Sequence, residues 1–141
     1  MSKAVSNRSA AVAAWTRLVR IHQKIDAASE HHFKASGLNT AWFDVIARIG
    51  ARPGLSQGEL ADTLLVTKGN VSQLIVKMES AGLVERRAEG RFQHLFLSPQ
   101  GQSIHDEVVP RQESLLEGTL AALSPEDQST LLRLLRRWEG A

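Results

Sequence analysis

Apolar positions with helical spacing lie on both sides of a short turn near the centre of the chain. Before the turn, Leu60, Ala61 and Leu64 share one face of a predicted helix that begins after Ser56. After it, apolar residues recur at i, i+3, i+4 and i+7, the spacing of one helix face: Val71, Leu74, Ile75 and Met78. The pattern predicts two helices joined by a three-residue turn.

Capping residues support both helices. Ser56 followed by Glu59 is a capping box, in which the serine side chain accepts from the third amide and the glutamate reaches back to the N–H of the cap. A second cap is predicted at Thr67, and Gly82 is predicted to end the second helix as a left-handed residue. The segment therefore carries the start and stop signals of a helix-turn-helix unit.

The face of the second helix opposite its apolar stripe consists of short hydrogen-bonding side chains and two lysines. Its members are Lys68, Gly69, Asn70, Ser72, Gln73, Val76 and Lys77. Amides and hydroxyls can pair with base edges in a major groove, and lysines can neutralise phosphates. These residues, apart from Val76 and together with Thr67, are the predicted DNA contacts of this helix. An ordinary polar face on a core helix is the alternative.

Two short apolar segments follow the second helix, from Leu83 to Arg87 and from Phe92 to Leu97, around a turn that contains Gly90. This arrangement predicts a β-hairpin. Arginines lie at its base and tip: Arg86, Arg87 and Arg91. Because a narrow minor groove attracts guanidinium groups, these arginines are predicted DNA contacts, with a solvated loop as the alternative. A helix-turn-helix followed by a hairpin is the winged-helix arrangement.

Both segments resemble the MarR family of bacterial transcription regulators. Residues 65–84, Leu-Val-Thr-Lys-Gly-Asn-Val-Ser-Gln-Leu-Ile-Val-Lys-Met-Glu-Ser-Ala-Gly-Leu-Val, look like that family's recognition helix and following strand. Residues 89–101, which begin Glu-Gly-Arg and end Leu-Ser-Pro-Gln-Gly, are similar to its wing. Residues 123–128 resemble the start of its final dimerisation helix. The resemblance extends from about residue 10 to about residue 140.

The resemblance implies a fold that is mainly α with a small β-hairpin wing, in a single domain over residues 1–141. The winged helix-turn-helix lobe is expected at about 38–98, and the dimerisation helices at about 8–35 and 100–140. The wing departs from the usual family pattern at three positions: Glu89 stands where aspartate is more usual, and Phe92 and His94 stand where polar residues are common.

Amphipathic patterns at both ends of the chain predict a homodimer. Between residues 12 and 25, apolar side chains cover about half of a helix circumference, more than one packing partner can hide. A helix from about 100 to 123, with a predicted kink at Pro110, and a further helix capped by Ser124 also carry broad apolar faces. These faces predict an intertwined homodimer that uses both termini, with a self-sufficient helical bundle as the alternative.

A small-molecule effector is implied by the resemblance. In the resembled family, small aromatic or phenolic molecules often bind in the crevice between the dimerisation helices and the winged helix-turn-helix lobe. The side chains in this sequence that can line such a crevice are Trp15, His22, His31, His32 and Trp42. The alternative is that the tryptophans belong to the core and that backbone carbonyls satisfy the histidines.

Composition narrows the setting in which the protein works. The 141 residues include no cysteine, which excludes disulfides and a thiol redox switch. The sequence has neither an apolar run of the roughly 20 residues that span a bilayer nor a signal-peptide core, so a cytoplasmic location and no membrane partner are expected. The net charge is only +2, but residues 1–98 hold 13 Lys and Arg against 8 Asp and Glu. This excess of positive charge orients the part of the chain that includes the winged helix-turn-helix lobe toward a polyanion.

Other function classes find less support. His31 and His32 with Glu30, or His32 with His105 across the chain, contain possible metal ligands, so a metal-responsive regulator is the alternative function. Adjacent helical residues point about 100° apart and cannot easily chelate together. The sequence lacks a catalytic nucleophile–base pattern and a Gly-rich phosphate loop, so no enzyme activity and no cofactor are expected. A helical interaction module with a vestigial helix-turn-helix is a third possibility.

Taken together, the sequence predicts a homodimer that binds double-stranded DNA and regulates transcription. Two recognition helices related by a two-fold axis require half-sites about 34–36 Å apart, which means an inverted-repeat operator. Repression is favoured over activation because it requires only occupancy of a promoter. An effector that binds the two arrangements of the lobes unequally would release the DNA.

Overall fold

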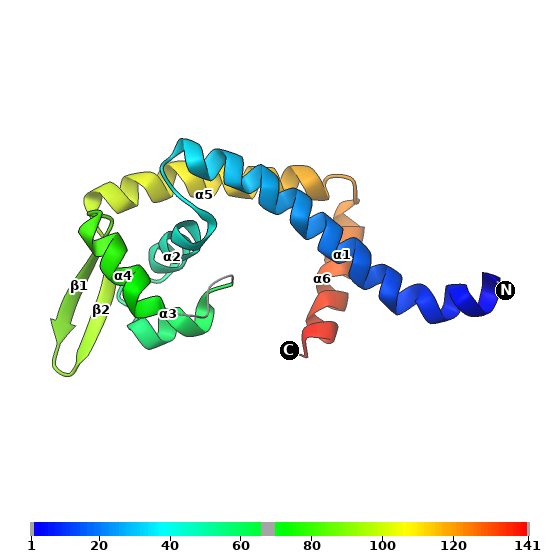
Figure 1. Cartoon of the computed structure of the whole chain (residues 1–141), viewed down its shortest axis with the longest axis horizontal. Coiled ribbons are helices and arrows are strands. Elements are labelled where there is room, and N and C mark those ends of the chain that lie inside the picture. Colours follow the sequence, from blue (N-terminus) through cyan, green and yellow to red (C-terminus); the bar gives the residue numbers. More distant parts are fainter. Residues whose placement is uncertain (1, 66–69, 141) are drawn as a thin grey trace.

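The computed structural model describes residues 2–65 and 70–140, with side chains from residue 9 onward (Figure 1). Within these ranges it contains six helices and one two-stranded antiparallel sheet, which confirms the predicted fold class. The elements are α1 (Ser2–Ala35), α2 (Thr40–Ala51), α3 (Gln57–Thr63), α4 (Val71–Ser80), β1 (Val84–Glu89), β2 (Phe92–Leu97), α5 (Pro99–Leu120) and α6 (Pro125–Glu139). None of these helices combines the length and apolar character needed to cross a membrane.

Helix α2 lies at the centre of the core. Its side chains Val45, Ile46 and Ile49 are fully buried, and α2 contacts α1, α3, α5 and β2. Phe33 from the end of α1 and Val108 from α5 are buried in the same core. The core of the winged lobe therefore includes side chains from the two long helices that the sequence assigns to dimerisation.

The predicted caps at Ser56 and Ser124 are confirmed, and Asn39 caps a further helix. Ser56 and Glu59 form the complete capping box of α3, and Asn39 and Ser124 cap α2 and α6. The sequence predicts a cap at Thr67, which lies outside the described residues. In the described part of the chain, α4 begins at Val71, and its cap is Asn70.

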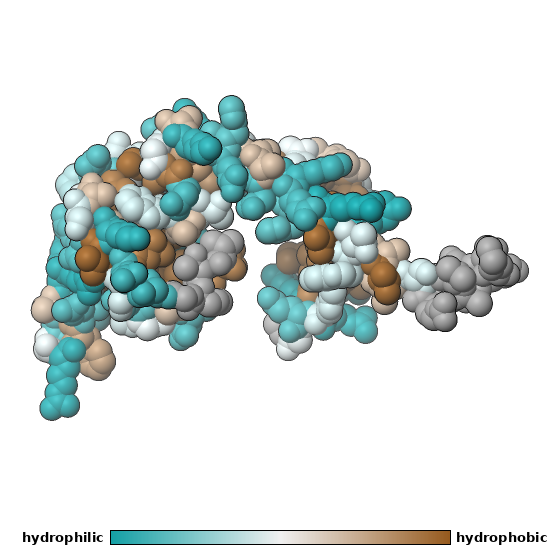
Figure 2. Space-filling view, in the orientation of Figure 1, coloured by the Kyte–Doolittle hydropathy of each residue, from teal (hydrophilic) through white to brown (hydrophobic). Residues whose placement is uncertain are grey.

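The long helices extend away from the winged lobe. In Figure 1, α1 crosses the molecule diagonally, α5 runs beside part of it, and α6 turns back beneath them. Helix α5 continues through Pro110. Apolar side chains gather where α6 lies near α1 (Figure 2). Trp15, Leu132 and Trp138 line a hollow between these helices and are exposed.

A compact junction joins α4, the hairpin and α5. Gly82 adopts φ +78°, its N–H donates to Glu79, and the N–H of Leu83 donates to the carbonyl of Met78, which together form a Schellman motif. After β2, at the same end of the hairpin, the Ser98 hydroxyl donates to the Gly82 carbonyl at 2.5 Å and accepts from the N–H of Gly101 at 3.0 Å. One serine therefore caps α5 and anchors the end of α4.

Gly101→Ala is expected to destabilise the fold by about 1–3 kcal/mol, because a Cβ at this position would clash with the Leu83 carbonyl oxygen inside the junction. Gly118→Ala in the same helix is the matched control. A Cβ there meets no atom within 4 Å, so it should stabilise the protein by about 0.5–1 kcal/mol. Urea unfolding at equal protein concentration measures both changes. Similar effects of the two substitutions would contradict the close packing at Gly101.

Candidate nucleic-acid interface

The exposed face of α4 is the one that the sequence predicts. Val71, Ile75 and Met78 are buried in the core. The opposite side of the helix is exposed and carries Ser72, Gln73, Val76 and Lys77. Thr67, Lys68 and Gly69, three further predicted DNA contacts, lie outside the described residues. The described part of the face thus combines a hydroxyl, an amide and an ammonium group around one apolar side chain.

Asn70 has a different position from the one that the sequence predicts. Its side-chain oxygen accepts from the N–H of Gln73 at 3.2 Å, so it caps α4 and does not belong to the helix itself. Readout of adenine by asparagine uses the amide oxygen and nitrogen together. Because the oxygen is engaged in the cap, Asn70 offers DNA mainly its amide N–H groups.

A buried carboxylate, which no sequence pattern predicts, holds the end of α3. Asp44 on α2 is 5 % exposed, and its Oδ2 accepts from the N–H of Leu65 at 2.7 Å. Its Oδ1 accepts from Arg48 Nε at 3.4 Å. Asp44 therefore fixes the residue after α3 to the central helix, which sets where the connection to α4 starts.

The capping box of α3 is linked to α2 by an arginine. Arg52 Nη2 donates to Glu59 Oε2 at 2.5 Å, while Glu59 Oε1 accepts from the N–H of Ser56 at 3.0 Å. The hydrogen bond from the Ser56 backbone, followed by that with its hydroxyl, lowers the pKa of Glu59 below its ordinary value. The glutamate therefore stays ionised and holds the start of α3.

The wing is a tight hairpin that projects beyond α3 and α4 (Figure 1). Its strands pair from Val84 with Leu97 to Glu89 with Phe92, which leaves Gly90 and Arg91 as a two-residue turn. Gly90 supplies the positive φ, +61°, that such a turn requires at its first position. Arg91 is exposed at the tip, and beside it Phe92 is 66 % exposed.

The other two arginines of the hairpin have partners within the protein. Arg86 Nε donates to Glu79 Oε1 on α4 at 2.8 Å, which directs its side chain toward the recognition helix. Arg87 lies over the ring of Phe96 at 4.1 Å from the centroid and pairs with Glu85 at 3.6 Å. Of the three arginines predicted to contact DNA, Arg86 and Arg87 therefore have partners within the protein, and Arg91 lies at the exposed tip.

Comparison with known proteins shows a matching family model and a similar fold. The MarR family model matches residues 36–91, which span α2 to the tip of the wing. A MarR-family transcriptional regulator from Silicibacter pomeroyi superimposes with a TM-score of 0.75 at 26 % identity, over 99 % of this chain and 98 % of that one. The segment from α2 to the tip of the wing is therefore similar to the MarR family of transcription regulators.

Further comparisons agree with this similarity. An HTH-type transcriptional regulator of Bacillus cereus is 28 % identical over 124 residues, 87 % of this chain and 84 % of the relative. The structure of a MarR-family regulator from Listeria monocytogenes in complex with a 26mer DNA has a TM-score of 0.79 at 21 % identity, over 89 % of this chain and 86 % of that one. At 21 % identity, the similarity to the Listeria monocytogenes structure shows a shared fold.

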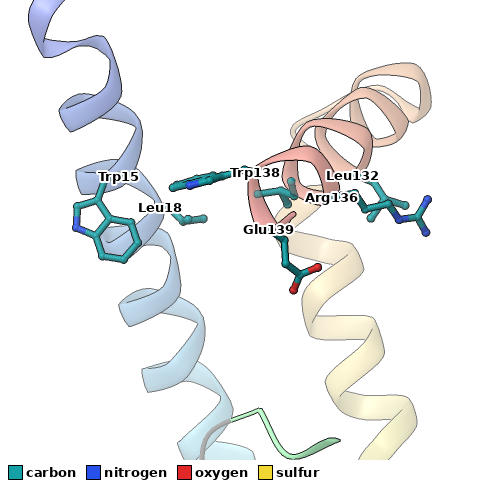
Figure 3. A pocket seen from close by; sticks show the side chains of 7 residues that line it. Trp15, Leu18, Leu132, Arg136, Trp138 and Glu139 are labelled. Carbon is teal, nitrogen blue, oxygen red and sulfur yellow. The ribbon is translucent and has the colours of Figure 1, made fainter. Parts of the chain in front are cut away.

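Four of the five side chains predicted to line an effector crevice, Trp15, His22, His32 and Trp42, do not share one cavity. Trp15 lies on α1 opposite Trp138 of α6, with ring centroids 6.3 Å apart (Figure 3), and both line a hollow of about 550 Å³. His22 lines a neighbouring hollow that also includes Trp15. Trp42 borders a separate hollow beside α4, and His32 Nε2 donates to Gln112 Oε1 at 2.7 Å between α1 and α5.

The residues considered as metal ligands are similarly dispersed. Among the described residues, no group of three or more His, Cys, Asp or Glu side chains is placed to hold a metal ion. His105 Nδ1 lies 3.0 Å from Asp106 Oδ1, which together with Gln102 lowers the pKa of Asp106. His32 uses its Nε2 to bond Gln112. The two histidines therefore have separate partners.

Arg86→Ala is expected to lower the free energy of unfolding by about 1–2 kcal/mol, because it removes a charge-assisted hydrogen bond and leaves Glu79 without that partner. Arg91→Ala is the matched control, since it removes an arginine from the exposed tip and should change stability by less than about 0.5 kcal/mol. Equilibrium urea unfolding measures both. Equal stability of the two variants would show that the Arg86 pair contributes nothing to the fold.

Proposed function

We propose that this protein is a DNA-binding transcription regulator of the MarR family, a homodimeric cytoplasmic repressor that binds an inverted-repeat operator and leaves it when a small aromatic effector binds. One observation carries the proposal: α4, whose outer face carries exposed hydrogen-bonding side chains, packs beside the projecting wing (Figure 1). A helix and a hairpin placed in this way can contact a major groove and the adjacent minor groove of one duplex.

The side chains of this surface suit the two tasks of DNA recognition. Ser72, Gln73 and the amide of Asn70 offer hydrogen bonds to base edges, while Lys77 and Arg91 offer positive charge to phosphates or to a narrow minor groove. Thr67, Lys68, Gly69 and Arg87 are proposed to add further contacts. The Listeria monocytogenes regulator of the same fold was crystallised with a 26mer DNA, which supports a duplex as the partner.

Uncovered apolar side chains support the homodimer. Trp15 on α1 and Trp138 on α6 are 56 % and 58 % exposed, and Leu132 and Leu134 of α6 are each 48 % exposed. Contiguous apolar surface of this kind normally marks an association site. A second copy of the chain can cover it, and a two-fold axis through these helices would present two copies of α4 to one side of a duplex.

Release by an effector requires unequal binding to two arrangements of the dimer. The hollow between Trp15 and Trp138 joins the two helices that are proposed to form the dimer, and its aromatic walls suit a flat apolar ligand. A ligand there would change how α1 meets α6, and hence the distance between the two copies of α4. Repression follows from operator occupancy alone, so it needs no contact with polymerase.

Selection of bound duplexes from a random pool, followed by footprinting of the recovered site, tests the proposal. The recovered sequences should contain an inverted repeat whose half-sites are centred about one helical turn, roughly 34–36 Å, apart. Sedimentation of the complex should give two chains per duplex. Failure to recover any duplex at low ionic strength would remove the proposed function.

Gln73→Ala and Lys77→Ala are expected to affect binding in different ways. Loss of the Gln73 amide should relax base preference at one position of each half-site, at a cost of roughly 1–3 kcal/mol for the preferred base. Loss of the Lys77 charge should weaken binding to every sequence and reduce the slope of log K against log salt by about 0.9 for each phosphate that the lysine neutralises. Fluorescence anisotropy over a salt series measures both. If Gln73→Ala left base preference unchanged, the reading face would be misassigned.

Leu132→Lys is expected to convert the dimer into a monomer, because it places an ammonium group in the apolar surface between α6 and α1. Thr130→Lys adds the same charge to an exposed position of the same helix and should remain dimeric. Sedimentation velocity at micromolar concentration distinguishes the two states. Dimers of both variants would place the interface elsewhere.

A further inference from the structure

A chain of hydrogen bonds connects the wing to the exposed face of α4. Arg86 Nη1 donates to Gln57 Oε1 at 3.4 Å, and Gln57 Nε2 donates to Ser72 Oγ at 2.6 Å. The guanidinium is held from two other sides, since its Nε donates to Glu79 and its Nη1 donates to Gln93 Oε1 at 3.0 Å. Four elements, α3, α4, β1 and β2, therefore meet at one arginine.

The direction of this chain follows from the chemistry of arginine. A guanidinium group only donates hydrogen bonds, so the side chain of Gln57 must turn its carbonyl oxygen toward Arg86. The amide nitrogen of Gln57, which also only donates, then faces Ser72. Ser72 Oγ accepts from that nitrogen, and its own hydroxyl hydrogen is left for another acceptor.

We propose that Ser72 acts as a hydrogen-bond donor to DNA and that Arg86 and Gln57 hold it in this polarity. Ser72 is exposed on the face of α4 proposed to read DNA, so the inference rests on that proposed function and adds its chemistry. The matching group on DNA is an acceptor: a purine N7, a guanine O6, a thymine O4 or a phosphate oxygen. An amino group of adenine or cytosine could donate only to the second lone pair of Ser72 Oγ and would leave the hydroxyl hydrogen unpaired, so it matches less well.

This polarity gives Arg86 and Gln57 a role that the sequence does not reveal. Both are positioning residues that act through Ser72, and neither needs to touch DNA. An arginine that contacts a phosphate would contribute to the salt dependence of binding. Arg86 instead determines, through Gln57 and Ser72, which atoms of DNA can form a hydrogen bond with the serine. The wing thereby influences base readout by α4 through a side-chain network.

The test uses the duplex recovered by selection and modifies one acceptor at a time. Replacing each purine by its 7-deaza analogue removes N7, and 2-aminopurine and 5-methyl-2-pyrimidinone remove guanine O6 and thymine O4. Methylphosphonates remove the charge and an acceptor oxygen of single phosphates. One modification should weaken wild-type binding by roughly tenfold, the effect of one hydrogen bond, and should leave binding by Ser72→Ala unaffected. A base analogue and a methylphosphonate distinguish the two sources of the acceptor.

Gln57→Glu tests the relay while it retains the serine. A carboxylate accepts from Arg86 and from Ser72 at the same time, so the serine hydrogen turns inward and its oxygen faces DNA as an acceptor. The sensitivity to the acceptor modification should disappear. Gln93→Glu is the matched control, because it places the same charge on the same guanidinium without contacting Ser72. It should weaken binding to all duplexes alike and keep the sensitivity.

Thermal unfolding of both glutamate variants establishes that they are folded, and selection repeated with each provides a second readout. Gln57→Glu should change base or phosphate dependence at the Ser72 position, and Gln93→Glu should recover the wild-type site. The inference is overturned if Gln57→Glu retains the acceptor sensitivity or if Ser72→Ala shows the same sensitivity as wild type. If the wild-type protein binds no duplex, the proposed function fails first and this inference fails with it.

Discussion

The packing of α4 against the core determines which of its side chains are exposed. Ile75 and Met78 are fully buried, and burial of each such side chain stabilises a fold by about 1.5–3 kcal/mol. Rotating the helix by one residue, about 100°, would bring these side chains into solvent. The core therefore fixes the rotation of α4, and the exposure of Ser72, Gln73 and Lys77 follows from the burial of the opposite face. Because these exposed polar side chains contribute little to packing, the core does not dictate which functional groups they carry.

The wing and α4 are joined at two places. At the base, the Schellman turn at Gly82 and the hydroxyl of Ser98 hold the end of α4 to the start of α5. Farther along the hairpin, the guanidinium of Arg86 reaches Glu79 on α4 and Gln57 on α3. These contacts hold α3, α4, the wing and the start of α5 in one arrangement.

Local rules predicted the helix-turn-helix and the hairpin well, because caps, turns and apolar periodicity depend on neighbours within a few residues. The capping box at Ser56 and the left-handed Gly82 are of this kind. Long-range partners were not predictable. Arg86 has the same local signature as Arg91, and only the fold brings Glu79 and Gln57 to it. For the same reason, four of the five residues assigned to an effector crevice are distributed over three places.

The most direct test of the account is site-directed DNA cleavage from the α4 face. The chain has no cysteine, so Gln73→Cys creates a single attachment point for an iron chelate, and Arg137→Cys on α6 provides a control far from the proposed surface. On the selected duplex, the probe at position 73 should cleave at two symmetric sites about one helical turn apart, and the probe at position 137 should not. Absence of cleavage from position 73, or the same pattern from both positions, would contradict the assignment of α4 as the DNA-reading helix.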